Sequence, residues 1–128
     1  MQFQLITPEK VFFSGEAEEV NVPGEDGDFG VLTGHAPTIS TLKPGVVVIR
    51  TTEGNTHKVA TLGGVAEAIP ERCSVLAEVA RSLDGVSKEQ LGVELDEAES
   101  KISKAVTDDE KRLAEEERSL INAALAGL

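Results

Sequence analysis

The sequence is poor in aromatic residues and in positive charge. Its 128 residues include four Phe, no Trp and no Tyr, so stacking of nucleic acid bases on aromatic side chains is nearly excluded. Acidic residues outnumber basic residues by 23 to 12, which gives a formal net charge of −11. Because recognition of phosphates needs clustered Lys and Arg, this balance predicts no nucleic acid partner.

Cysteine and histidine are also scarce. The single cysteine, Cys73, cannot form a disulfide within the chain, and its apolar neighbours predict a small buried side chain rather than a nucleophile. Together with Cys73, the distant His35 and His57 supply too few ligands for zinc, and the two histidines are too poorly framed for a catalytic triad. The chain also lacks the short motifs of hydrolases. We therefore expect no catalytic residue, no metal and no cofactor.

Long hydrophobic runs are missing as well. No apolar stretch approaches the ~20 residues that a membrane-spanning helix requires, and no signal peptide precedes Met1. We expect a cytosolic chain that reaches a membrane only through a partner. A length of 128 residues suits either one compact domain or one small domain with an appendage.

The first two-thirds of the chain show the alternation of apolar and polar residues that is typical of strands. Strands are predicted over residues 3–6, 11–22, 45–50, 56–62, 65–69 and 73–79, with turns containing Gly, Pro or Asn between them. Short strands at this spacing predict an antiparallel β-sandwich over residues 1–84. Residues 46–49 (VVVI) are apolar on both faces, which predicts a strand buried between two layers.

The periodicity becomes helical after Gly85. Ser87 with Gln90, and Thr107 with Glu110, fit capping boxes at the starts of two helices. Each helix has one apolar stripe, formed in the first by Leu91, Leu95, Ala98, Ile102 and Ala105 and in the second by Leu113, Leu120, Ile121, Ala124 and Leu125. Such helices must pack on each other, on the sandwich or on a partner. The predicted fold class is α+β, with a two-helix hairpin over residues 85–128.

Residues 23–45, PGEDGDFGVLTGHAPTISTLKPG, form the most distinctive segment. Glycines at 24, 27 and 30 alternate with Glu25, Asp26 and Asp28, which predicts a shaped acidic loop rather than a strand. A phosphate cradle is disfavoured because the acids would repel phosphate. A calcium loop is disfavoured because Pro37 stands where a bidentate Glu is needed. Docking to a partner and ordinary solvated surface acids remain as the two interpretations.

Seven short motifs follow one another over the first two-thirds of the chain. They read ITPE at 6–9, GEAE at 15–18, GVL at 30–32, GHAP at 34–37, LKPG at 42–45, GGVAE at 63–67 and LAE at 76–78. In this order they resemble the epsilon subunit of bacterial F-type ATP synthases. The resemblance implies a non-catalytic rotor subunit of the central stalk, peripheral at the cytoplasmic face of the inner membrane, which couples proton-driven rotation to ATP synthesis. The implied partners are the gamma subunit, the membrane rotor ring and, for the tail, the catalytic beta subunit.

The resemblance also assigns two surfaces. It implies that the membrane rotor ring is met by Glu25, Asp28, Phe29, Gly30 and His35, and that gamma packs near Gly63, Gly64 and Val65. From the residues alone, Gly63 and Gly64 are also explained by a bend between strands. Taken alone, a histidine such as His35 more often satisfies a local hydrogen bond than binds a ligand, and Ala36-Pro37 after it favours an extended turn.

The tail departs from the pattern of related tails. Some epsilon subunits bind ATP through Ile/Leu-Asp-x-x-Arg-Ala, and here Leu95 and Asp96 are followed by Glu99 and Ser100, so an anion replaces the phosphate-facing cation. Residues 107–128 carry six acids and three bases, a net charge of −3 that should weaken approach to an acidic partner. At most weak inhibition of ATP hydrolysis is expected. An ATP-sensing regulator is the alternative function, and a generic sandwich adaptor is a third.

Overall fold

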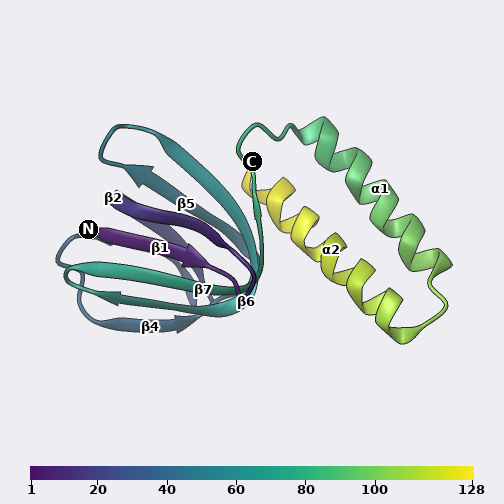
Figure 1. Cartoon of the computed structure of the whole chain (residues 1–128), viewed down its shortest axis with the longest axis horizontal. Coiled ribbons are helices and arrows are strands. Elements are labelled where there is room, and N and C mark those ends of the chain that lie inside the picture. The colour runs from purple at the N-terminus through teal and green to yellow at the C-terminus, as the bar shows by residue number, and fades with distance from the viewer.

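The computed structural model describes residues 1–128 and contains a β-sandwich with a helical hairpin attached to one side (Figure 1). Its elements are β1 (Gln2–Ile6), β2 (Val11–Gly24), β3 (Gly27–Leu32), β4 (Thr38–Thr41), β5 (Gly45–Thr51), β6 (Thr56–Ile69), β7 (Arg72–Ser82), α1 (Lys88–Lys104) and α2 (Asp108–Gly127). The predicted α+β class, with strands first and two helices last, is confirmed. Residue 84, the predicted boundary, falls between the end of β7 and the start of α1.

The strands form one sheet that closes on itself. Its order is β1-β7-β6-β5-β2-β3, β4 pairs with β6, and an additional pairing of β1 with β2 closes the ring. All pairings are antiparallel except β1 with β7, which run parallel from Gln2 beside Arg72 to Ile6 beside Leu76. The parallel pair was not predicted, because it joins segments about 70 residues apart and no local pattern encodes that orientation.

The prediction of a loop at the glycine-rich segment is wrong for most of its length. Residues Gly27–Leu32 are strand β3, which pairs with β2 in register from Gly24 beside Gly27 to Glu19 beside Leu32. Val31 is buried and Phe29 half-buried, while Asp28 and Gly30 point to solvent. This is ordinary period-2 alternation, and it prevails over the glycine content because β2 supplies hydrogen-bond partners along the whole segment. Only Glu25 and Asp26 form the turn.

The predicted break at Gly63 and Gly64 is also wrong. Both lie inside the single strand β6, with φ of 63° and 106°, so the strand bends there without ending. The first half of β6 pairs with β5 and the second half with β4, a short strand that the sequence did not reveal. A Cβ atom on Gly64 would lie 2.0 Å from the carbonyl oxygen of Leu76, so the bend itself requires glycine at this position.

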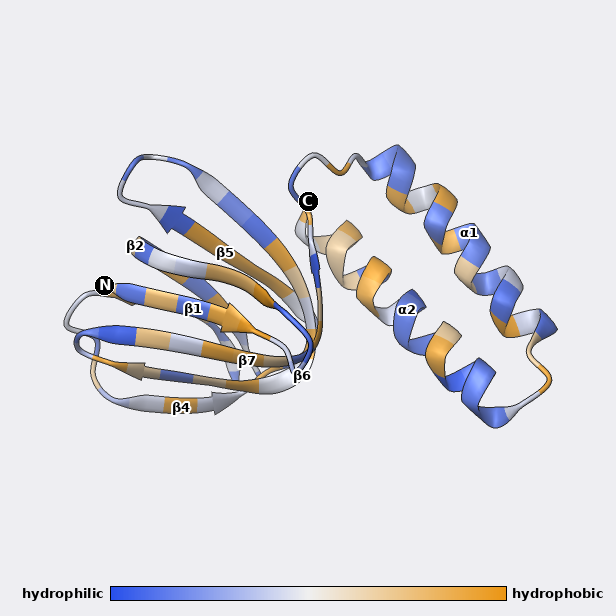
Figure 2. Ribbon diagram, viewed as in Figure 1, coloured by the Kyte–Doolittle hydropathy of each residue, from blue (hydrophilic) through white to orange (hydrophobic).

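Two separate clusters of buried side chains hold the chain together. The larger cluster fills the sandwich and includes Phe3, Leu5 and Cys73, and burial raises the pKa of the Cys73 thiol to about 11. The predicted buried role of Cys73 is therefore confirmed. The smaller cluster joins the helices to the outer face of the sheet (Figure 2). Val47 faces the first cluster and Val46 packs on the second, as the two-sided apolar run predicts.

The helices begin where the capping residues predict. The Ser87 hydroxyl accepts from the N–H of Gln90 at 3.1 Å, and the Thr107 hydroxyl accepts from the N–H of Glu110 at 3.1 Å. Leu113 does not belong to the buried stripe of α2, because it is 54% exposed while Ala114 is buried. The C-terminal part of α2 lies between the sheet and α1, whereas its N-terminal part, near the turn from α1, is covered by α1 alone (Figure 1). The buried face of α2 is therefore narrower at its N-terminal end, where Leu113 lies. Neither helix is long and apolar enough to cross a membrane.

Candidate docking site

The turn between β2 and β3 carries the acids that the sequence singles out. Gly24 pairs with Gly27 across the hairpin, and Glu25 and Asp26 occupy the two turn positions between them. Glu25, Asp26 and Asp28 are all exposed, the Asp28 side chain to 60%. We call Glu25, Asp28, Phe29, Gly30 and His35 the docking residues, and the hairpin segment 24–30 that bears the first four the docking hairpin. The carboxylates of Glu25, Asp26 and Asp28 are accessible from solvent.

Neighbouring residues before β5 contact the docking hairpin. The N–H of Glu25 donates to the carbonyl of Thr41 at 2.9 Å, and the hydroxyl of Thr41 donates to the Glu25 carboxylate. The Lys43 ammonium lies 3.3 Å from the Asp28 carboxylate. Sequence reasoning gave no role to Thr41 or Lys43, although Lys43 belongs to the LKPG motif.

Phe29 and His35 lie beside each other at the far end of the docking residues. Their ring centroids are 6.3 Å apart, and the inner side of Phe29 packs on the sandwich core. The N–H of His35 donates to the carbonyl of Leu32 at 3.0 Å, and its Nδ1–H to the carbonyl of Ala36 at 2.7 Å. These bonds hold the half-buried imidazole in place. A Cβ on Gly30 would meet nothing within 4 Å, so packing within the chain does not require glycine there.

Two exposed apolar side chains flank the turn that bears His35. Leu32, the last residue of β3, is 51% exposed, and Ile39 on β4 is 73% exposed. Sequence reasoning missed both residues. Ile39 gave no signal because β4 itself was not predicted, whereas Leu32 stood in the GVL motif without an assigned role. The two side chains add exposed apolar surface on either side of the turn that bears His35.

The residues assigned to gamma lie next to the docking hairpin through β4. Thr41, which contacts Glu25, pairs with Val65 of β6, and the N–H of Leu42 donates to the carbonyl of Gly64 at 3.0 Å. On the other side of β6, Val65 pairs with Leu76, which is 45% exposed. Leu76 also lines a groove of about 360 Å³, together with Ile6, Thr7, Pro8, Ala77 and Glu78. The two assigned surfaces are therefore neighbours on one hydrogen-bonded sheet.

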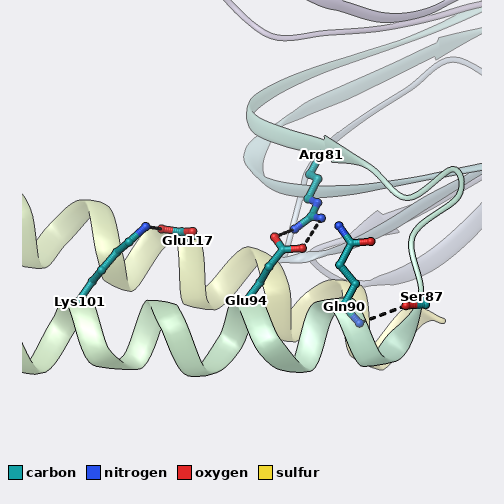
Figure 3. A network of polar contacts seen from close by, with 6 residues as sticks. All are labelled: Arg81, Ser87, Gln90, Glu94, Lys101 and Glu117. Carbon is teal, nitrogen blue, oxygen red and sulfur yellow. Dashed lines mark hydrogen bonds and ion pairs between the residues drawn. The ribbon is translucent and has the colours of Figure 1, made fainter.

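The residues assigned to ATP lie on α1, apart from these surfaces. Leu95 is half-buried against the helical cluster, while Asp96 and Glu99 are both exposed. The main polar contact of α1 with the sandwich is an ion pair of Glu94 with Arg81 on β7 (Figure 3). Arg81 Nη2 is 2.8 Å from Glu94 Oε2, and this hydrogen bond from Arg81 lowers the pKa of Glu94. The pair ties the hairpin to the sheet.

The fold defines a β-sandwich protein with a C-terminal helical hairpin, and comparison with known proteins places it more closely. The family model described as "ATP synthase, Delta/Epsilon chain, beta-sandwich domain" matches residues 1–82. The chain is 42% identical over 113 residues to the ATP synthase epsilon chain of Bradyrhizobium sp. (strain ORS 278), which covers 88% of this chain and 83% of the relative. It is 41% identical over 126 residues to ATP synthase epsilon chain 1 of Nitrobacter hamburgensis, covering 98% and 84%. The chain therefore belongs to the ATP synthase epsilon chain family.

Solved structures share the fold at lower sequence identity. A chain in the Euglena gracilis mitochondrial ATP synthase OSCP/F1/c-ring structure superposes with a TM-score of 0.71 at 21% identity, covering 97% of this chain and 78% of that one. A chain in the Tetrahymena thermophila mitochondrial ATP synthase central stalk/c-ring structure gives 0.63 at 15% identity, covering 97% and 95%. At these identities the comparison supports the fold.

Proposed function

We propose that this chain is a non-catalytic rotor subunit of the ATP synthase central stalk, which links gamma to the membrane rotor ring. The observation that carries the proposal is its identity of about 40% with ATP synthase epsilon chains over nearly its whole length. The similar Tetrahymena chain comes from an assembly of central stalk and c-ring, which agrees with these partners. ATP synthesis belongs to the complex, and this subunit supplies mechanical coupling.

The arrangement of the two surfaces suits the transmission of torque. The docking hairpin faces the ring, and gamma packs on the bend of β6 at Gly63, Gly64 and Val65 with the exposed Leu76 beside it. Force entering at Glu25 passes through Thr41 into β4 and from there into β6 by backbone pairing. Close-packed sheet deforms little under load, so this path is stiff.

The docking hairpin suits a cationic or polar surface of the ring. Its exposed acids attract positive groups at long range. Burial of the exposed apolar side chains of Leu32 and Ile39 then contributes favourable free energy to binding as water is displaced. The subunit would then be held at the cytoplasmic face of the inner membrane through its partners.

The tail has at most a weak regulatory role in this proposal. The net charge of −3 over residues 107–128 disfavours insertion beside an acidic segment of the beta subunit. Nucleotide sensing is disfavoured by the exposed Glu99, which stands one turn from Asp96 and would repel phosphate. A calorimetric titration with ATP is expected to show no binding tighter than about 1 mM.

Reconstitution tests the main proposal. The catalytic sector assembled without this chain should bind poorly to membranes that carry the rotor ring, and the membranes should then lose proton-driven ATP synthesis. Adding the purified chain should restore both the binding and the synthesis. The same complex should keep ATP hydrolysis by its catalytic sector in either case, because the chain takes no part in the chemistry. Full coupling in the absence of the chain would refute the proposal.

A further inference from the structure

The segment that joins β4 to β5 runs alongside the docking hairpin like a further short strand. At its start, Glu25 donates its N–H to the Thr41 carbonyl at 2.9 Å. At its end, Lys43 donates its N–H to the Pro23 carbonyl at 3.0 Å. Between them, Leu42 forms a β-bridge with Gly24. The backbone of the hairpin is therefore held along residues 23–25, on the β2 side of the turn.

The side chains of the same segment reach the docking acids. The Thr41 hydroxyl donates to the Glu25 carboxylate, and Lys43 Nζ lies 3.3 Å from Asp28 Oδ1. Glu25 and Asp28, the two acids assigned to the ring, thus each have a partner from this segment. The partners, Thr41 and Lys43, are two residues apart. No other Lys or Arg forms an ion pair with an acid of the hairpin.

Packing at the base of the hairpin leaves little room for alternative positions of the segment. A Cβ on Gly45 would lie 2.6 Å from the Cβ of Pro23, and a Cβ on Gly24 would lie 2.8 Å from Cε1 of Phe29. Both glycines are sites of close approach between the segment, the hairpin and the core. The Lys43 backbone is therefore held in place, and its side chain is presented to Asp28.

We propose that Thr41 and Lys43 are positioning residues of the docking hairpin, and that Asp28 acts through its pair with Lys43 rather than by presenting a free negative charge to the ring. This inference rests on the proposed function. Without the Lys43 ammonium, three exposed carboxylates would share one tight turn and repel each other. A hairpin fixed in advance loses less conformational freedom when the ring binds.

Charge exchange separates positioning from direct contact. The catalytic sector carrying variants of this chain is bound to membranes stripped of that sector, and the apparent affinity is measured over a range of salt concentrations. Lys43→Asp should weaken binding by about tenfold, because it breaks the pair with Asp28 and places a like charge beside that carboxylate, so the hairpin is no longer held in position. The double variant Asp28→Lys with Lys43→Asp should recover to within about threefold of the wild-type affinity, since the pair is restored with its sign reversed.

The opposite result would overturn the inference. If Asp28 met the ring as an anion, the double variant would bind at least as weakly as Asp28→Lys alone. Thr41→Val should cost about threefold in affinity at every salt concentration, because it removes a hydrogen bond and no charge. Unchanged binding by both Thr41→Val and Lys43→Asp would exclude a positioning role.

Matched controls come from the same sheet. Arg50 on β5 and Glu19 on β2 form a similar exposed ion pair at 2.9 Å, away from the hairpin, and exchanging their charges should leave membrane binding unchanged. Thermal unfolding of each variant reports any loss of folding. Omission of the whole chain tests the proposed function separately. If coupling is lost without the chain but is unchanged in the charge variants at Asp28 and Lys43, only the positioning inference is refuted.

Discussion

The Arg81–Glu94 pair should control how firmly the helical hairpin is held on the sandwich. It joins β7 to α1 through two parallel hydrogen bonds, and both side chains are about three-quarters buried (Figure 3). The remaining contacts of the hairpin with the sheet come mainly from α2, where Leu120, Ile121 and Ala124 are buried. Glu94→Gln keeps the shape of the side chain and removes its charge.

The magnitude follows from the burial of the pair. Exposed ion pairs contribute up to about 1 kcal/mol, while breaking a fully buried pair costs about 3–5 kcal/mol. A bidentate pair at the intermediate burial of Arg81 and Glu94 should therefore contribute about 1–2 kcal/mol. This corresponds to a population of detached hairpin that rises about 5- to 30-fold in the variant.

Native-state hydrogen exchange measures this population segment by segment. In the wild type, amides of α1 should exchange before those of β6, because the cluster that holds the hairpin is smaller than the sandwich core. Glu94→Gln should accelerate exchange in α1 and α2 and leave β6 unaffected. Lys101→Met is the control, since Lys101 pairs with Glu117 within the hairpin and is 60% exposed. Equal protection of α1 and β6 in the wild type, or no change in the variant, would refute the reasoning.

Acid should have the same effect as the substitution. Because Arg81 holds the pKa of Glu94 below its unfolded value, the stabilisation by this pair is fully present above the unfolded pKa of about 4.3 and is lost as the pH falls through the lower folded pKa. Detachment of the hairpin should therefore increase below about pH 4, and less so in Glu94→Gln.

Three further predictions concern the rest of the chain. Gly64→Ala should destabilise the protein by about 3 kcal/mol or more in chemical denaturation, because its Cβ would meet the Leu76 carbonyl, whereas Gly92→Ala in α1 should stabilise it by about 1 kcal/mol; equal effects would contradict the role of the bend. Cys73 should react with thiol reagents only at the rate of unfolding, since it is buried and its thiol pKa is raised; rapid labelling of the native protein would contradict this. Deleting residues 87–128 in the assembled complex should change ATP hydrolysis by less than about twofold, and a several-fold increase would show that the tail inhibits despite its negative charge.

The candidate site was accessible to sequence reasoning only in part. Glu25 and Asp28 could be named because they stand in the glycine-rich acidic segment, and His35 because it stands in the GHAP motif; the structure leaves the two acids exposed on one hairpin. The positioning role of Thr41 and Lys43 could not be predicted, because it depends on their contacts with Glu25 and Asp28, which lie 15 or more positions away in the sequence. Neither residue type carries a signal of that contact in its own neighbourhood.

The sequence by itself determined the family, the order of strands before helices, the capped starts at Ser87 and Thr107, and the buried role of Cys73. These features depend on motifs, local periodicity and short-range hydrogen bonds, all of which can be read within a few residues. Only the tertiary structure decided that β3 is a strand, that β6 runs unbroken through its glycines, that β1 and β7 are parallel, and that Arg81 holds α1 through Glu94. Each of these outcomes depends on which distant segment supplies the hydrogen-bond partner or the opposite charge, and that choice is made by packing of the whole chain.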